Sequence, residues 1–281
     1  MRIAALQTDL HWENRAANFQ HIQNHINDLE NIDLIILPEM FNSGFTMNPA
    51  SIAEDYNGAT LSWMKKLAKE KQANIIGSIA IKRDESFYNS LFWVQPNGQY
   101  FFYDKRHLFR MANEHKHYKN GTDLLIVNKN GFNFCPLVCY DLRFPVWSRN
   151  IDSDFSFKYD VLIYIANWPE ARISAWVSLL QARAIENQAY VVGVNRIGID
   201  GNNVKYCGES RIFNPKGERL DSFEKNKESV QFVQLNKEFL KEFRKNSQQT
   251  LMQTHLKLFE IPYYFNVPPG FNFNWFIVVS N

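Results

Sequence analysis

The chain has 281 residues, 45% hydrophobic and 21% charged, which is the composition of a globular protein and excludes a disordered one. Lys and Arg number 31 and Asp and Glu 29, so the net charge of +2 offers neither a basic face for nucleic acid nor a polybasic membrane anchor. Residues 1–9 reach an acid before any stretch of signal-peptide length, and no run of 18 apolar residues occurs. These features predict a soluble cytoplasmic protein whose three cysteines stay reduced.

The first part of the chain alternates apolar runs with helical patterns. Residues 3–7 predict a strand, and apolar residues at steps of three and four between 19 and 29 predict a helix. The unbroken aliphatic run 33–37 predicts a strand that is buried on both faces. Thr60 is expected to cap a second helix, after which residues 74–80 return as a strand.

A hairpin is predicted next, because strands 88–94 and 100–103 flank the turn sequence Gln-Pro-Asn-Gly-Gln. A long polar segment, 104–123, then contains several histidines. The clearest helix has its apolar stripe between Ile173 and Ala184, and a last helix is expected near 236–246. The remaining expected strands are 124–127, 132–138, 160–166, 190–195, 211–213 and 229–235, with another around Lys205.

Helices between strands indicate a layered α/β architecture, and the inserted hairpins make its sheets mixed. The sequence shows no internal repeat or low-complexity block, so we predict one domain over residues 1–260. Residues 261–281 differ from the rest: they are aromatic, rich in Asn and Pro, and without clear periodicity. We treat them as a C-terminal tail to which the sequence assigns no role.

Three reactive side chains share one position relative to the predicted strands. Glu39 follows the run LIILP, Lys105 follows YFFYD and Cys139 follows PLV. Ligands of such folds bind outside the carboxyl ends of the strands, so we expect the three groups to converge although 66 and 34 positions separate them. Each also has an ordinary interpretation: an exposed loop acid, a solvated cation and a small buried thiol.

Together the three groups form a coherent chemical unit. A free thiol has a pKa near 8.5, so only about 3% is thiolate at pH 7. A carboxylate that accepts the proton, beside a lysine that stabilises the anion, would make Cys139 a nucleophile. We expect Lys105 also to face the oxygen of a tetrahedral intermediate with the backbone N–H of Tyr140, where such a donor contributes about 3–4 kcal/mol.

Four longer stretches carry a family resemblance: LPEMFNSGF (37–45), YDKRHLFRMANEH (103–115), PLVCYDLRFPVWSRN (136–150) and ANWPEARISAWVSLLQARAIENQAYVVGVNRIGIDG (166–201). With these, the chain resembles the nitrilase superfamily of carbon–nitrogen hydrolases, most closely its omega-amidase branch, over residues 1 to about 260. The resemblance implies a four-layer αββα sandwich with two mixed β-sheets, commonly paired as a homodimer. The ending 263–281 departs from the family pattern, which leaves the dimer contacts there open.

The resemblance also implies roles. Glu39, Lys105 and Cys139 match the family's catalytic triad, and Glu114 matches a second glutamate that orients the lysine near the substrate. The implied reaction is amide hydrolysis through a cysteine thioester, with release of ammonia and with no metal or organic cofactor. The implied partners are a small-molecule amide and a second copy of the chain, with no nucleic acid and no membrane.

Omega-amidases cleave the terminal amide of 2-oxo dicarboxylic acid monoamides such as 2-oxoglutaramate, and the resemblance extends this substrate class to the chain. An anionic substrate end needs a cation, and Arg143 is the candidate because a guanidinium can grip a carboxylate through two hydrogen bonds. The ordinary alternative for Arg143 is a structural ion pair with Asp141 or another acid. Trp168 and Phe45 are expected to line the substrate pocket, although aromatic residues more often serve packing.

Other interpretations remain open. The same catalytic residues could serve a nitrile, an N-carbamoyl compound or deaminated glutathione, and some superfamily members pass ammonia to a partner domain or are non-catalytic binding partners. A metal site is another possibility, with His107, His115 and His117 beside Cys139 as the ligands. For the histidines we favour a solvated loop.

Overall fold

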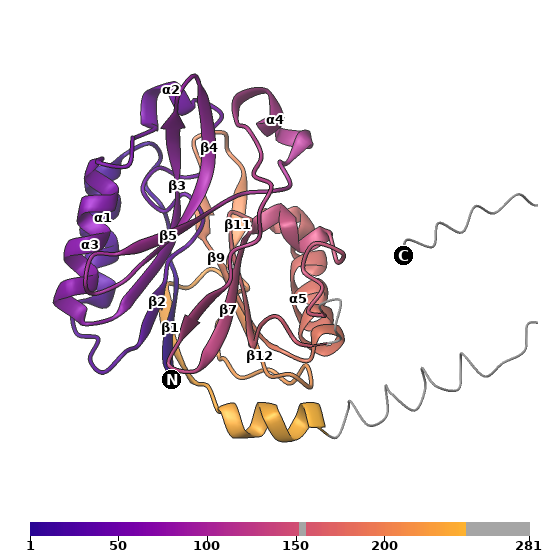
Figure 1. The fold of residues 1–281 in the computed structure, drawn as a ribbon. Coiled ribbons are helices and arrows are strands. Elements are labelled where there is room, and N and C mark those ends of the chain that lie inside the picture. The colour runs from indigo at the N-terminus through magenta and orange to yellow at the C-terminus, as the bar shows by residue number, and fades with distance from the viewer. Residues whose placement is uncertain (152–155, 246–281) are drawn as a thin grey trace, which may run out of the picture. The chain divides into compact units, whose positions relative to one another are not determined.

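The computed structural model describes residues 1–151 and 156–245 (Figure 1). The chain divides into two compact units, Met1–Leu240 and Lys241–Asn281. Residues 237–245 are helical, close to the predicted helix at 236–246. The predicted tail, 261–281, and the last part of the predicted domain lie outside the described residues.

One sheet has six strands in the order β13-β1-β2-β3-β4-β5. Neighbours β1, β2 and β3 run parallel, whereas the pairs β13–β1, β3–β4 and β4–β5 are antiparallel, so the sheet is mixed as predicted. The strands are β1 (Arg2–Gln7), β2 (Leu34–Ile36), β3 (Asn74–Arg83), β4 (Ser86–Val94), β5 (Tyr100–Asp104) and β13 (Ser229–Gln234).

The second sheet has five strands in the order β12-β9-β8-β7-β6, with parallel pairing of β7, β8 and β9 and antiparallel edges. A separate two-stranded ribbon pairs β10 with β11. These strands are β6 (Val127–Lys129), β7 (Phe132–Val138), β8 (Val161–Ala166), β9 (Tyr190–Asn195), β10 (Ile197–Ile199), β11 (Lys205–Cys207) and β12 (Arg211–Phe213).

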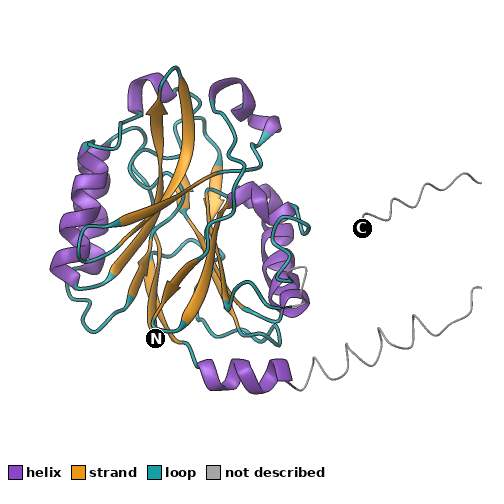
Figure 2. Ribbon diagram, in the orientation of Figure 1, coloured by secondary structure: helices purple, strands orange, loops and turns teal. Residues whose placement is uncertain are grey.

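The two sheets face each other between two layers of helices (Figure 2). Helices α1 (Arg15–Ile26) and α3 (Ala59–Lys71) lie on the outer side of the six-stranded sheet, and α5 (Ile173–Asn187) lies on the outer side of the other (Figure 1). Two short helices, α2 (Pro49–Ile52) and α4 (Glu114–His117), lie in the loops between strands. The architecture is therefore the αββα sandwich, and the prediction of this fold class is confirmed.

Alternating side chains explain why the layers stack in this order. On β1, Ile3 and Ala5 belong to the apolar cluster between the sheets, whereas Ala4 and Leu6 belong to the cluster beneath α1 and α3. Successive residues of a strand point to opposite faces, so a strand that is apolar throughout must be covered on both. On the other outer face, a Cβ at Gly193 of β9 would lie 2.3 Å from the Leu180 side chain, so glycine lets α5 approach closely.

The structure corrects three details. Thr60 does not cap α3, whose N-cap residue is Gly58; instead the Glu54 carboxylate accepts hydrogen bonds from the backbone N–H and the hydroxyl of Thr60. A carboxylate at a helix start satisfies the unpaired N–H groups there as a capping hydroxyl would. Strand β6 begins at Val127 rather than at residue 124, and β10 was not predicted.

No helix in the described part of the chain combines the length and apolar character needed to cross a bilayer.

The parallel strands position the functional loops. Their carboxyl ends place loops from both sheets at the same end of the sandwich.

Candidate active site

The site forms where loops from both sheets meet. Glu39 follows β2 and Lys105 follows β5 in one sheet, whereas Cys139 follows β7 and Asn167 follows β8 in the other. The backbone N–H of Asn167 donates to Oε2 of Glu39 at 2.7 Å, and the Asn167 side-chain amide donates to the Glu39 carbonyl at 2.6 Å. These two hydrogen bonds fix the loops of the two sheets against each other.

Lys105 carries a buried ammonium group held by two carboxylates. Its Nζ lies 3.0 Å from Oε1 of Glu39 and 3.0 Å from both oxygens of Glu114, and all three side chains are fully buried. Burial by itself lowers the pKa of Lys105, but the charges of Glu114 and then Glu39 outweigh it and hold the pKa above its usual value. Lys105 is therefore protonated at neutral pH.

Glu114 begins α4 and accepts a hydrogen bond from the backbone N–H of Phe109 at 2.5 Å. Burial raises the pKa of Glu114, the charge of Lys105 opposes that rise, and the nearby negative charge of Glu39 adds to it. Two carboxylates thus share one ammonium group in a site buried from bulk solvent. Removal of the lysine would leave both without their counter-charge, which is costly in a buried site.

The carboxylate of Glu39 has a fixed orientation. Oε1 accepts hydrogen bonds from Lys105 and, at 2.8 Å, from the side-chain amide of Asn89 on β4, while Oε2 accepts from Asn167. Partners on both oxygens prevent the carboxylate from rotating. A carboxylate held in this way can accept a proton from a fixed direction.

Cys139 occupies a strained position at the start of a short 3₁₀ turn, Cys139–Arg143. Its φ of 47° lies in the left-handed region, which costs a residue with a side chain roughly 1–2 kcal/mol. Met40, directly after Glu39, and Asn113, directly before Glu114, also have positive φ, at 46° and 59°. Backbone strain of this kind gathers at functional sites, where the surrounding structure enforces it.

Cys139 as a whole residue is 9% exposed, and its Sγ lies 4.0 Å from the carbonyl oxygen of Asn167. Burial raises the pKa of this thiol, the charge of Glu39 raises it further, and the charge of Lys105 opposes both. The resting group is consequently a neutral thiol rather than a thiolate. It can act as a nucleophile only if a neighbouring base takes its proton during attack.

A cleft of about 730 Å³ opens onto Cys139 and Asn167. Six aromatic residues line it: Trp12, Phe45, Phe109, Tyr140, Trp168 and Tyr206. Its charged lining residues are Glu13, Arg143, Arg172 and Asp200. A pocket with apolar walls and a few charged groups suits a small molecule with one charged end.

Arg143 points into this cleft rather than pairing with Asp141. Its guanidinium carbon lies 5.1 Å from the centre of the Trp168 ring, and none of the acids within residues 1–151 and 156–245 forms an ion pair with it. Asp141 has other partners, because it accepts hydrogen bonds from the Tyr103 hydroxyl at 2.8 Å and from the backbone and ring of His107. The Asp141 alternative for Arg143 is therefore wrong.

The structure also places the other residues singled out from the sequence. Phe45 and Trp168 line the cleft, as does Tyr140, and Nζ of Lys105 lies 5.0 Å from the centre of the Phe45 ring. Trp168 is held by hydrogen bonds from its indole N–H to the Arg172 carbonyl and from its backbone N–H to Asn195.

The three histidines of the polar segment do not gather around Cys139. His107 stacks on Phe144 with ring centres 3.7 Å apart and contacts Asp141, whereas His115 and His117 are exposed on α4. None of the three belongs to the group of potential metal ligands that the described residues bring together.

Three residues of the site were missed by the sequence analysis. Asn167 follows a predicted strand, so the rule that selected Glu39, Lys105 and Cys139 could have found it. Asn89 lies within β4 and Arg172 lies just before α5, and neither position carries a local signal. Arg172 adds a second cation to the cleft, with its guanidinium carbon 5.2 Å from the centre of the Phe109 ring.

Comparison with known proteins gives concordant results. A family model described as "Carbon-nitrogen hydrolase" matches residues 2–245. The chain is 45% identical over 246 residues to "Omega-amidase YafV" of Escherichia coli strain K12, covering 87% of this chain and 93% of that one. It is 32% identical to "2-oxoglutaramate amidase" of Bacillus subtilis strain 168, over 78% and 84% of the two chains.

Among solved structures, the chain resembles XC1258 of Xanthomonas campestris, described as a CN-hydrolase superfamily protein with an arsenic adduct in its active site. The TM-score is 0.85 and the sequence identity 38%, and the match covers 89% of this chain and 96% of the other. The likeness therefore extends over nearly all of the sandwich.

Proposed function

The chain belongs to the carbon–nitrogen hydrolase family and acts on amides, and from this premise we propose that it removes the terminal amide of a 2-oxo dicarboxylic acid monoamide through a thioester on Cys139. The names of its omega-amidase and 2-oxoglutaramate amidase relatives support this substrate class. The observation that carries the mechanism is the fixed, buried Glu39 carboxylate, held by Lys105 and Asn167 beside a thiol whose pKa is raised.

In the first half-reaction, Glu39 takes the thiol proton while Sγ of Cys139 attacks the amide carbon. The electron pair of the carbonyl bond moves to its oxygen and forms a tetrahedral intermediate. Protonated Glu39 then gives the proton to the leaving nitrogen, the C–N bond breaks and ammonia departs. The acyl group remains on Cys139 as a thioester.

In the second half-reaction, Glu39 deprotonates a water molecule that attacks the thioester carbon. The intermediate collapses, the C–S bond breaks, and the proton on Glu39 returns to the sulfur. The products are ammonia and the dicarboxylic acid, and every group of the enzyme regains its starting state. No step needs a metal or an organic cofactor.

Lys105 and the backbone N–H of Tyr140 are the proposed donors to the oxygen of each tetrahedral intermediate. Lys105 suits this role because Glu39 and Glu114 fix its ammonium group and its raised pKa keeps it charged. Donors that are oriented before the reaction stabilise the developing charge without reorganisation. Glu114 acts as a positioning residue, since its two oxygens both contact Nζ.

Arg143 is the proposed partner of the distal carboxylate of the substrate. It lies at the cleft without an acidic partner among the described residues, on the face of Trp168. The aromatic walls, Phe45 included, would pack against the short carbon chain of the substrate. Arg172 is a second cation in the lining of the same cleft.

The proposal is tested by ammonia release from a panel of compounds supplied to the purified chain. The panel contains 2-oxoglutaramate, the same amide without the carboxylate, the corresponding nitrile and an N-carbamoyl amine. We expect the highest kcat/KM with 2-oxoglutaramate and a loss when the carboxylate is absent. A higher kcat/KM with the nitrile or the carbamoyl compound would contradict the proposed substrate class. Size-exclusion chromatography of the same sample tests the predicted homodimer.

A further inference from the structure

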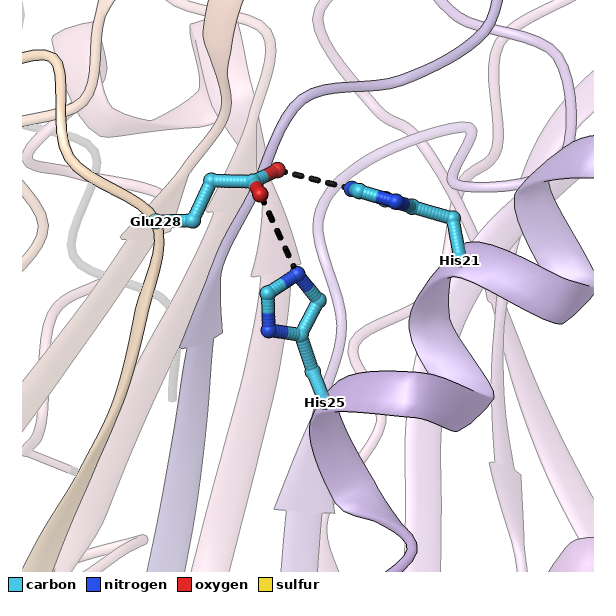
Figure 3. Close-up of side chains that lie close together, drawn as sticks. All are labelled: His21, His25 and Glu228. Carbon is cyan, nitrogen blue, oxygen red and sulfur yellow. Dashed lines mark hydrogen bonds and ion pairs between the residues drawn. The ribbon is translucent and has the colours of Figure 1, made fainter.

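A second cluster of titratable side chains lies outside the cleft. Helix α1 carries His21 and His25, which are four residues apart and therefore project from the same face. Both rings point toward Glu228, in the segment just before β13 (Figure 3). Nε2 of His21 lies 2.7 Å from Oε1 of Glu228, and Nε2 of His25 lies 3.3 Å from Oε2.

The spacing of these atoms suits a metal ion. One ligand atom from each of the three residues lies within 4.8 Å of the other two. Zinc binds imidazole nitrogen and carboxylate oxygen at about 2.0–2.2 Å in tetrahedral geometry, which places ligand atoms roughly 3.3 Å apart. We infer that His21, His25 and Glu228 form a binding site for one zinc ion, separate from the hydrolase site.

The residues behind the carboxylate support the inference. The hydroxyl of Thr8 and the backbone N–H of Asp9 donate to Oε1 of Glu228 at 2.8 and 2.9 Å. These donors directly follow β1 and hold the carboxylate in place beside α1. Hydrogen bonds that orient a ligand from behind are a regular feature of metal sites, and their loss weakens metal binding about 10–100-fold.

The cluster is also open to an ion from solvent. The side chains of His21, His25 and Glu228 are 26%, 25% and 31% exposed, and none of them lines the catalytic cleft. Three protein ligands leave a fourth tetrahedral position for water. A bound ion would therefore join α1 to the segment before β13 without touching Cys139.

Ligand chemistry selects the class of metal. Two imidazoles and one carboxylate favour zinc and its neighbours in the first transition row, whereas calcium and magnesium prefer sites made of oxygen alone. Because only the folded chain brings the three residues together, zinc would bind the native state and raise the melting temperature. The competing interpretation is a cluster held by hydrogen bonds alone.

The test is calorimetric titration of zinc chloride into the full chain carrying Cys139→Ala, which removes the thiol that lines the cleft. We expect one ion per chain and a rise in melting temperature. Each of His21→Gln, His25→Gln and Glu228→Gln should weaken binding by roughly tenfold or more. The matched controls are His115→Gln and His117→Gln, exposed histidines of α4 that should leave the affinity unchanged.

Two results would overturn the inference. One is the absence of zinc binding by the Cys139→Ala chain at millimolar zinc. The other is a zinc affinity that is unchanged by the three ligand substitutions, or that the α4 control substitutions lower by as much. Either outcome would place the ion elsewhere. Circular dichroism of each variant confirms that it is folded. The visible spectrum of the cobalt-loaded chain reports whether the coordination geometry of the ion is tetrahedral.

Discussion

Two clusters in this protein each join carboxylate and basic side chains from distant parts of the sequence, and they differ in how deeply they are buried. The cluster of Glu39, Lys105 and Glu114 is fully buried, and the protein itself supplies each charge with its partners. The cluster of His21, His25 and Glu228 is a quarter to a third exposed.

The difference teaches what burial does to a charged group. In the buried cluster the side chains solvate one another in place of bulk water, so the groups are fixed and their pKa values depend on one another. In the exposed cluster, water or an ion can take any place that a side chain vacates. We therefore assign the covalent chemistry to the first cluster and an exchangeable ligand to the second.

The largest expected effect is on turnover. Cys139→Ala removes the proposed nucleophile and should lower kcat by roughly 10⁴-fold or more. Glu39→Gln keeps the shape of the side chain but not the base, and should lower kcat by about 10²–10⁴-fold. Ammonia release from 2-oxoglutaramate measures both. His25→Gln is the control from the exposed cluster and should retain full turnover. A fall in its kcat as large as that of Glu39→Gln would contradict the assignment of catalysis to the buried cluster alone.

The next effect is on stability. Lys105→Met leaves Glu39 and Glu114 without their shared counter-charge and should lower the free energy of unfolding by about 3–5 kcal/mol. His25→Gln removes a partly exposed contact and should cost at most about 1 kcal/mol without zinc. Urea denaturation measures both values. The double variant Lys105→Met/Glu114→Gln should recover part of the loss, and equal costs for the two single variants would contradict the argument from burial.

A smaller effect is expected on substrate binding. Arg143→Lys keeps the charge but loses the paired hydrogen bonds, and a hydrogen bond to a charged group contributes about 1.5–3 kcal/mol. KM for 2-oxoglutaramate should thus rise roughly tenfold or more, while KM for an amide without a carboxylate stays the same. The matched control is Arg149→Lys, an exposed arginine that does not line the cleft. An equal rise for both amides would remove Arg143 from carboxylate binding.

The smallest effect concerns the pH at which the thiol reacts. Because burial and the charge of Glu39 raise the pKa of Cys139 well above that of a free thiol, alkylation of this residue by iodoacetamide should keep accelerating above pH 9. Glu39→Gln removes one cause of the shift, so its profile should move toward lower pH even though turnover is lost. Mass spectrometry of the Cys139 peptide follows the rate. Saturation of the wild-type rate below pH 8 would contradict the environment described for the thiol.

Much of the fold follows from local patterns. Unbroken apolar runs predict β2, β8 and β9, because strands buried on both faces need no polar side, and the stripe from Ile173 to Ala184 predicts α5. The boundaries of the helices and strands were less predictable. Thr60 has the chemistry of a helix cap, but Glu54, six residues earlier, takes that function from a neighbouring segment.

The candidate site could be predicted only in part, because some of its residues follow strands and others are placed by pairing between distant segments. Glu39, Lys105 and Cys139 follow strands, and strand ends converge, so their proximity to one loop cluster follows from the sequence. Asn89 orients Glu39 from the middle of a strand, and only the antiparallel register of β3, β4 and β5 brings it there. Similarly, the spacing of His21 and His25 is visible on a helix, but Glu228 lies 207 positions after His21.

The most direct test of the central claim is to trap the intermediate. The purified chain is mixed with 2-oxoglutaramate, quenched in acid and analysed by intact-mass and peptide mass spectrometry. We predict a mass increase equal to the acyl group left after loss of ammonia, located on Cys139 and absent from Cys139→Ala. Ammonia release without any such adduct, or an adduct on Cys135 or Cys207 instead, would contradict the mechanism.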